Sequence, residues 1–327
     1  MEKRNERIRI FAGSSSRAFA GKMCSYLGIE AGISEVFQFS EGNTYVKIGE
    51  NVRNKDVYIV QTVGLKANDS FMELLFWIDS FKRSSARSVT VIMPYFSYAK
   101  ADKKDEPRVS IRARVCADCI EIAGADRVIT IDLHSPQIQG FFKKPVDNLY
   151  AYPLLCEYMK SRGTADLVVV SPDAGFARDA RRYGSYLGVP VYICEKTRTD
   201  HSERASVNIL SGPLAAKNAL IVDDFTISGG TLIETANLMK EKGVDQVYAM
   251  VTHALLHEKA IEELMKSPIH RLIATDTVEN PNLLNNEKIE IISVAPLFAE
   301  AVNIIQHEGS LSSLFDSLPE RVLKSSF

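Results

Sequence analysis

The sequence lacks any apolar run that approaches the about 18 residues a membrane-spanning helix needs. Its basic N-terminal stretch leads directly into a strand-like segment at 7–11, without the central apolar region of a secretory signal. It also lacks a basic excess, because 39 Lys and Arg stand against 41 Asp and Glu, a net charge of −2. A nucleic-acid backbone would meet no broad positive surface. We therefore expect a cytoplasmic protein with neither a membrane nor a nucleic acid as partner.

Cysteine is sparse and does not form a regular pattern. The five cysteines are odd in number and scattered, which indicates reduced thiols rather than a disulfide framework. Cys116 and Cys119 form a CxxC, but they lie in a stretch of helical spacing and have no second pair. We interpret them as two thiols on a helix and not as a metal or redox site.

Short β-branched runs alternate with longer segments of helical periodicity along the 327 residues. The expected strands are 7–11, 57–60, 88–93, 127–131, 167–170, 189–193, 219–222, 246–251, 271–275 and 289–294. The expected helices include 71–83, 178–188, 231–243 and 257–267. Because the strands are apolar throughout, both their faces must be buried, and the intervening helices provide the crossovers that parallel strands need. The sequence predicts an α/β fold with open, mostly parallel sheets.

The length favours two domains, since domains typically contain about 100–150 residues. A break is expected near 146–153, after one strand series and before the series that opens at Leu167. We assign 1–150 to an N-terminal domain and 151–327 to a C-terminal domain, and we expect the last helix to pack back on the first domain.

Two acids and a loop of small residues follow the expected strand 219–222. The stretch IVDDFTISGGT places Asp223 and Asp224 at the carboxyl end of this strand, and Ser228 to Thr231 lead directly into the next helix. Without bulky side chains, such a loop can aim several N–H groups and the helix dipole at one anion. The carboxyl ends of parallel strands are also where α/β sheets bind ligands.

The same stretch indicates a class of ligand. No Lys follows the glycines, so the loop differs from the one that grips the β and γ phosphates of a nucleotide. A phosphomonoester held by N–H groups and by the hydroxyls of Ser228 and Thr231 suits it, and adjacent carboxylates accept hydrogen bonds from vicinal hydroxyls. Together they match a sugar phosphate. The alternative is a helix start with a glycine turn, whose acids only complement the helix dipole.

IVDDFTISGGT resembles the PRPP-binding motif of the phosphoribosyltransferase superfamily. Further stretches resemble one family within it, the ribose-phosphate diphosphokinases or PRPP synthetases. These stretches are FSEGNTYVKIGENVR, NDSFMELLFWIDSFKRSSA, YAKADKKD, AGADRVITIDLHSPQIQGFF, PVDNLYAYP, VSPDAG and GSLSSLF, and they run along nearly the whole chain.

The resemblance implies a fold of two phosphoribosyltransferase-like α/β domains with the active site between them. It also implies a reaction, in which the C1 hydroxyl of ribose 5-phosphate attacks the β-phosphorus of MgATP to give PRPP and AMP. The implied cofactor is Mg²⁺. The implied assembly is a homodimer as the minimal unit, commonly built into hexamers.

The resemblance also assigns roles to residues. The expected contacts of ribose 5-phosphate are Asp223, Asp224, Thr226, Ile227, Ser228, Gly229, Gly230 and Thr231. Lys196 and Arg198, in a loop after an expected strand, would neutralise the transferring group. His134 and Asp173 resemble the Mg²⁺-associated residues, and His134 is also a candidate for direct contact with ATP phosphate. Asp132 is expected to support His134.

The nucleotide side departs from the family pattern in several places. The expected ATP contacts are Phe39, Glu41, Asn43, Lys100, Ala101, Asp105 and His134. Asn43 stands where the family has Glu, and Lys100 and Ala101 stand where it has Arg and Gln, so a bidentate fork and an amide are lost. Phe176 occupies a position that is usually glycine, where a ring would crowd backbone that passes close to the ligand. The donor nucleotide is left open.

Many family members have a regulatory site for phosphate or ADP, built from Arg, Lys and C-terminal serines. The residues in similar places are Arg53, Lys104, Arg108, Ser310, Ser312 and Ser313. Control by phosphate or ADP is therefore a hypothesis. The charged run DKKDEPR, taken alone, is more typical of a solvated turn.

Two other functions remain open at this point. The first is a regulatory subunit that keeps the fold and has lost turnover, which the changed nucleotide contacts suggest. The second is a nucleobase phosphoribosyltransferase, which shares IVDDFTISGGT but would normally need only one such domain and would lack DLHSPQIQGFF.

Overall fold

The computed structural model describes residues 7–197, 206–210, 214 and 216–327, with the backbone alone for 195–197, 206–210 and 316. The chain divides into two compact units. Unit 1 contains Met1–Tyr150, Thr277–Glu279 and Val294–Ser326, and unit 2 contains Ala151–Asp276, Asn280–Ser293 and Phe327. This division differs from the single cut expected at residue 150, because two later segments join unit 1. The last helix lies in one of these segments.

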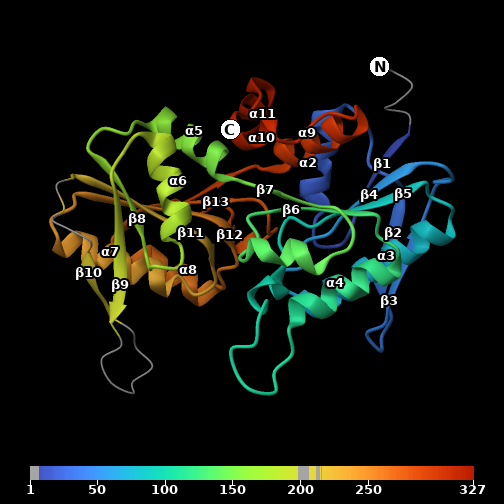
Figure 1. The fold of residues 1–327 in the computed structure, drawn as a ribbon, viewed down its shortest axis with the longest axis horizontal. Helices are drawn as coiled ribbons and strands as arrows, with labels where there is room; N and C mark the ends of the chain where they lie inside the picture. The colour runs from blue at the N-terminus through green and yellow to red at the C-terminus, as the bar shows by residue number, and fades with distance from the viewer. Residues whose placement is uncertain (1–6, 198–205, 211–213, 215) are drawn as a thin grey trace. The chain divides into compact units, whose positions relative to one another are not determined.

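Unit 1 is built on an open parallel sheet of five strands in the order β1-β4-β5-β6-β7 (Figure 1). Its strands are β1 (Ile8–Ala12), β4 (Asp56–Val60), β5 (Ser88–Ile92), β6 (Arg127–Ile131) and β7 (Val146–Leu149). A separate antiparallel pair is formed by β2 (Ser34–Gln38) and β3 (Thr44–Ile48). Every residue of β4 is buried, which is the environment that its apolar run Val57–Val60 requires, and the buried Asp56 pairs with Arg87.

Helices cover both faces of the first sheet. On one face, α3 (Ala67–Arg83) and α4 (Arg112–Ala123) pack Trp77, Phe81 and Ala117 against Val91 and Val128 of the strands. The other face is covered by α2 (Arg17–Leu27) and α9 (Ala295–Gln306). Phe19 packs edge-on against Phe298, with ring centroids 5.4 Å apart. Unit 1 also contains η1 (Ser97–Lys100), η2 (Pro136–Phe141), α10 (Ser313–Asp316) and α11 (Glu320–Ser326).

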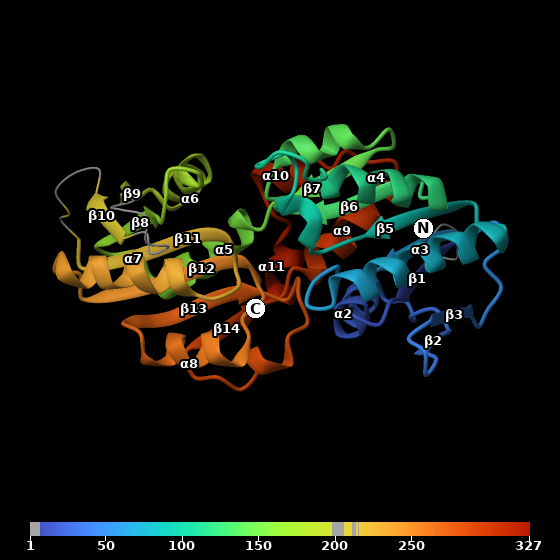
Figure 2. The same cartoon turned by 90° about the horizontal axis from the view of Figure 1, so that it is seen from below.

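Unit 2 is built on a sheet of seven strands in the order β10-β9-β8-β11-β12-β13-β14, parallel except for β10 (Figures 1 and 2). The strands are β8 (Leu167–Ser171), β9 (Val191–Thr197), β10 (Ser206–Leu210), β11 (Asn218–Thr226), β12 (Gln246–Ala254), β13 (Ile269–Thr275) and β14 (Ile289–Ile292). The strand β11 lies in the middle of this order, with parallel neighbours β8 and β12. Its carboxyl end is therefore flanked by two other carboxyl ends.

Helices also cover both faces of the second sheet. The helices α7 (Gly230–Glu241) and α8 (Glu258–Lys266) pack on the face that presents Ile221, Ala249 and Val251. The helices α5 (Tyr152–Arg162) and α6 (Ala177–Leu187) lie together, and the rings of Tyr152 and Tyr183 approach to 5.9 Å between centroids. The short helix η3 (Pro281–Leu283) completes the unit. Each unit is thus an open, mostly parallel sheet flanked by helices, as the sequence predicts.

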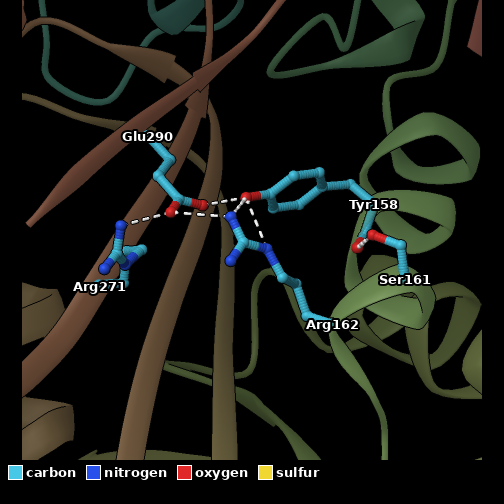
Figure 3. A network of polar contacts seen from close by, with 5 residues as sticks. All are labelled: Tyr158, Ser161, Arg162, Arg271 and Glu290. Atoms are coloured by element: carbon cyan, nitrogen blue, oxygen red, sulfur yellow. Dashed lines mark hydrogen bonds and ion pairs between the residues drawn. The ribbon is translucent and has the colours of Figure 1, made fainter. Parts of the chain in front are cut away.

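A polar network joins α5 to the last strands of the second sheet (Figure 3). Arg162 donates to the hydroxyl of Tyr158 from Nη2, at 2.6 Å, and to Glu290 Oε1, at 3.1 Å. Glu290 also accepts from Tyr158 and from Arg271. Ser161 donates to the backbone oxygen of Tyr158 at 2.7 Å. Because each polar group has a partner within the network, it holds α5 against β13 and β14 rather than offering a ligand site.

All the expected strands and helices are present, with boundaries that move by a few residues. The strands β2 and β3, which were not expected, are short and mostly exposed. The short strand β10 was also not expected, and the helices α2, α5 and α9 were not among those named from the sequence. Cys116 and Cys119 lie on α4, as expected, and burial raises the pKa of Cys116 to about 12. Among the described residues, no helix combines the length and the apolar composition that crossing a bilayer requires.

We expect the variant Phe298→Ala to lower the free energy of unfolding of unit 1 by about 3–5 kcal/mol, because it leaves a cavity against Phe19. Trp77 is the only tryptophan and is buried in unit 1, so its fluorescence during urea unfolding reports on this unit. Ile122→Ala, at a side chain that is 85% exposed, is the matched control and should cost less than about 0.5 kcal/mol. A cost below about 1 kcal/mol for Phe298→Ala would mean that the segment from Val294 is not part of this core.

Candidate active site

The carboxyl end of β11 brings together the acids that the sequence indicated. The strand is buried from Ala219 to Val222, and Asp223 and Asp224 then follow, both partly exposed. Asp173 follows the neighbouring strand β8, and its charge acts on Asp223. Three carboxylates therefore gather at one edge of the second sheet.

Asp223 is held in an environment that disfavours its charge. Burial comes first among the causes, followed by the charge of Asp224, and together they raise the pKa of Asp223 well above that of an ordinary aspartic acid. Asp173 raises it further. The backbone is tightly folded here, because the N–H of Asp224 donates to Asp223 Oδ1 at 3.0 Å and the N–H of Phe225 donates to Asp224 Oδ1 at 2.9 Å. Such a cluster is typical of a ligand site rather than of a stabilising element.

The loop after the acids leaves a helix start open. Gly229 has φ 74°, a left-handed conformation that favours glycine, and Ser228 Oγ accepts from the N–H of Gly230 at 3.3 Å. Ile227 and Ser228 are exposed. The helix α7 starts at Gly230. Its N-cap residue is Gly229, which has no side chain to cap the helix, and its first turn contains no acid. Backbone N–H groups and the positive end of the helix dipole are thus directed to the same edge as the acids.

Asp173 lies in a tight turn at the start of α6. Its Oδ1 accepts the N–H of Phe176 at 3.1 Å, and its backbone oxygen accepts the hydroxyl of Ser171 at 2.7 Å. A side chain at Gly175 would lie 3.1 Å from Asp173 Oδ1, so this glycine suits the close approach. Phe176 has φ −90° and ψ −1°, which any residue adopts, and its side chain is half-buried. The backbone at Phe176 therefore does not itself require glycine.

The two residues expected to act on the transferring group, Lys196 and Arg198, are described only in part or not at all. Lys196 belongs to β9, where its backbone is in register with Val207 of β10, and its side chain lies outside the described residues. Arg198 lies outside them altogether.

His134 and Asp132 form a sharp turn after β6 in unit 1. Asp132 has φ 42°, which is uncommon for a residue with a side chain, and its N–H donates to Leu149 O at 3.0 Å. His134 is exposed. Among the described residues no group of three His, Cys, Asp or Glu could hold a metal ion, and His134 and Asp173 belong to different units.

The other expected nucleotide contacts lie in two exposed parts of unit 1. Phe39 and Asn43 close the turn from β2 to β3, where the N–H of Phe39 donates to Asn43 O at 2.8 Å. Phe39 is 44% exposed and packs edge-on against Phe37 at 5.0 Å between ring centroids. Glu41 is exposed in the same turn, and Asp105 is exposed in a later loop.

Lys100 and Ala101 end the short helix η1, and they differ in exposure. Lys100 is partly exposed, with Nζ 6.0 Å from the centroid of the Tyr95 ring. Ala101 is buried, and its backbone oxygen accepts the N–H of Ala113 at 3.2 Å. Ala101 therefore serves the packing of η1 on α4, and its methyl group offers a nucleotide no polar contact.

The residues of the hypothetical regulatory site all belong to unit 1 and are exposed. Ser310, Ser312 and Ser313 form a compact serine turn, in which the Oγ atoms of Ser310 and Ser312 lie 2.7 Å apart. Arg108 has φ 67°. Arg53 follows Asn51, whose side chain accepts the N–H of Arg53 at 2.9 Å. Lys104 is in the loop before α4.

An open parallel α/β unit that carries an acid pair and a small-residue loop leading into a helix at one sheet edge defines a protein of the phosphoribosyltransferase class. A family model described as the N-terminal domain of ribose phosphate pyrophosphokinase matches residues 8–124. Another, described as a phosphoribosyl synthetase-associated domain, matches residues 185–316. The chain belongs to the ribose-phosphate pyrophosphokinase family.

Individual relatives are similar over almost their whole length. The ribose-phosphate pyrophosphokinase of Caldanaerobacter subterraneus is 42% identical over 310 residues, which cover 94% of this chain and 98% of that protein. That of Synechococcus elongatus is 42% identical over 313 residues, covering 95% and 94%. The crystal structure of phosphoribosylpyrophosphate synthetase from Mycobacterium smegmatis matches with a TM-score of 0.87 and 33% identity, covering 93% of this chain and all of that one.

We expect Asp223→Asn to stabilise the protein at neutral pH. Because the pKa of Asp223 is raised on folding, its contribution to stability is fully present below the ordinary value of 3.8 and is lost as the pH rises through the raised value. An amide cannot ionise, so the variant should gain in Tm over the parent as the pH rises from about 4 to about 7.5.

Thermal unfolding at both pH values measures this gain. Asp245→Asn removes one negative charge from an exposed position before β12 and controls for the change in net charge. A Tm difference for Asp223→Asn that is the same at both pH values would contradict the raised pKa.

Proposed function

We propose that this chain transfers the pyrophosphoryl group of ATP to the C1 hydroxyl of ribose 5-phosphate, giving PRPP and AMP for nucleotide biosynthesis. The observation that carries the proposal is the acid pair Asp223 and Asp224 beside the open start of α7. The names of the relatives support the same reaction.

In this proposal the acceptor is bound at the edge of the second sheet. Asp223 and Asp224 accept hydrogen bonds from the ribose hydroxyls, and the stretch from Thr226 to Thr231 surrounds the 5-phosphate. The phosphate would accept hydrogen bonds from backbone N–H groups and from the hydroxyls of Ser228 and Thr231. The helix dipole would stabilise its negative charge. Ile227 can be apolar at this place because backbone groups do most of the binding.

The transfer forms a bond between the C1 oxygen and the β-phosphorus, and it breaks the bond between that phosphorus and the oxygen that stays with AMP. The hydroxyl proton is released, and negative charge gathers on the bridging and equatorial oxygens. Lys196 and Arg198 are the proposed cations that neutralise this charge, since phosphoryl transfer depends on positioning and electrostatics more than on covalent chemistry.

Mg²⁺ is the proposed metal, carried into the site on ATP. It prefers phosphate and carboxylate oxygens and keeps several waters, so one or two protein ligands are enough. Asp173 supplies a carboxylate, whereas the imidazole of His134 suits a phosphate oxygen better than it suits Mg²⁺. When bound, the metal would withdraw charge from the phosphate oxygens, while His134 and Lys100 fix the nucleotide.

For the base of the nucleotide, the exposed ring of Phe39 offers a stacking surface, and Glu41, Asn43 and Asp105 offer polar groups. We further propose a homodimer as the minimal unit, with larger assemblies such as a hexamer, and a cytoplasmic location. Regulation by phosphate or ADP through the serine turn 310–313 and the basic residues of unit 1 belongs to the same proposal.

The decisive assay incubates the pure protein with ribose 5-phosphate, Mg²⁺ and one of ATP, GTP or CTP, and measures PRPP together with AMP, GMP or CMP. We expect equal amounts of PRPP and nucleoside monophosphate with at least one donor. If no donor gives product while ribose 5-phosphate still binds, the chain is a regulatory subunit and the proposal fails.

We expect Lys196→Ala to lower kcat by about 10²–10³-fold, because it removes charge stabilisation from the transition state. Folding should be unaffected, since the residue belongs to the edge pair β9 and β10. Lys217→Ala, an exposed lysine just before β11, is the matched control and should stay within about 2-fold of the parent. A near-normal kcat for Lys196→Ala would remove this residue from the mechanism.

A further inference from the structure

The turn that carries His134 has an unusual backbone conformation, and neighbouring groups must hold it in place. Asp132 adopts φ 42°, in the left-handed region that few residues other than Gly, Asn and Asp enter. Such a conformation persists only where the surroundings fix it, and it is common at functional sites. The question is which groups fix this turn in unit 1.

The neighbouring strand β7 provides two anchors of the turn. The N–H of Asp132 donates to Leu149 O at 3.0 Å, which simply continues the pairing of β6 with β7. The N–H of Leu133 donates to Asn148 Oδ1 at 3.1 Å. This second bond depends on a side chain, and it holds the residue directly between Asp132 and His134.

Asn148 occupies a buried position that is energetically unfavourable for an amide side chain. Its side chain is only 5% exposed, and Nδ2 has no hydrogen-bond partner among the described residues. Thr130, its register partner on β6, is 1% exposed, and its Oγ1 also has no such partner. A buried donor left without a hydrogen-bond partner costs about 1–3 kcal/mol, so a leucine, which has the same branched shape, would suit the core better. The bond from Asn148 Oδ1 to Leu133 is the contact that a leucine could not make.

We propose that Asn148 is a positioning residue for the nucleotide. Through the N–H of Leu133 it fixes the strained turn after β6 and so aims the exposed imidazole of His134 at an ATP phosphate. The inference rests on the proposed function, because it needs His134 to contact the nucleotide. It adds a residue that touches neither substrate and whose effect must pass through His134.

A purely structural role would predict a different pattern. If Asn148 only stabilised unit 1, its loss would lower Tm, and any change in nucleotide affinity would be the same whether or not His134 were present. If it acts through His134, the two residues are coupled and their effects are not additive. A double-mutant cycle separates the two cases.

The experiment measures the dissociation constant of a non-hydrolysable MgATP analogue by calorimetry for the full chain and its variants, together with Tm. We expect Asn148→Leu to weaken binding by about 10-fold, and to weaken it by less than about 2-fold when His134→Ala is already present. Asn148→Asp keeps an acceptor for Leu133 and should stay within about 3-fold of the parent. Binding of ribose 5-phosphate should change by less than about 2-fold in each variant.

Thr130→Val is the matched control, since Thr130 is equally buried in the same row of the sheet and its hydroxyl does not hold the turn. It should leave nucleotide affinity within about 2-fold. Should Asn148→Leu fail to fold, Asn148→Ala removes the same acceptor with a smaller demand on packing and takes its place in the cycle.

Two outcomes would overturn the inference, and they are distinguishable from failure of the proposed function. Equal loss of affinity from Asn148→Leu in both backgrounds would make its role structural. No effect of His134→Ala on nucleotide affinity would remove the group through which Asn148 acts. In either case PRPP formation by the parent chain would still stand, because it is measured separately.

Discussion

The placing of an acidic pair at the carboxyl end of the buried strand β11, where Asp223 loses much of its contact with water, is the constraint around which unit 2 is built. The strand is fully apolar from Ala219 to Val222 and then places Asp223 and Asp224 at the sheet edge. Burying a carboxylate next to two others is costly, and nothing in the described part of unit 2 neutralises Asp223 by a salt bridge. A ligand with several hydroxyl donors explains why such a cluster is kept. The open start of α7 beside it explains why that ligand should also carry a phosphate.

The first unit uses the same architecture for different chemistry. After its strand β1, the N–H of Phe19 in the first turn of α2 donates to the carboxylate of Glu279 at 2.8 Å. The hydroxyl of Ser15 donates to Thr62 O at 2.6 Å, and the N–H of Thr62 donates to Ser16 Oγ at 2.8 Å. This helix start is closed by groups from other parts of unit 1. The proposed functional edge of unit 1 lies instead at the turn of His134, after β6.

Much of this fold could be predicted from the sequence because its buried strands consist of continuous apolar runs. The run LVVV of β8 and the run VYIV of β4 are buried throughout, and both were expected. The strands β2 and β3 were not expected, because as an exposed antiparallel pair they carry alternating and largely polar residues. The return of Val294–Ser326 to unit 1 depends on contacts such as Phe19 with Phe298, which no local pattern encodes.

The candidate site also has a part that the sequence could predict and a part that it could not. The acid pair and loop are adjacent in sequence and could be interpreted from their order alone. The role inferred for Asn148 could not, since it depends on a register between β6 and β7 and on the backbone angle of Asp132. An amide in the short strand VDNL, next to the buried Leu149, was the only available signal.

The central claim is that Asp223 and Asp224 recognise the ribose hydroxyls while the loop recognises the 5-phosphate. Calorimetric titration of the protein with ribose 5-phosphate and with 2-deoxyribose 5-phosphate, in the presence of a non-hydrolysable MgATP analogue, tests it most directly. We expect loss of the 2-hydroxyl to weaken binding by about 10–100-fold, the loss typical of a hydrogen bond to a carboxylate. Equal affinity for the two sugars would contradict it.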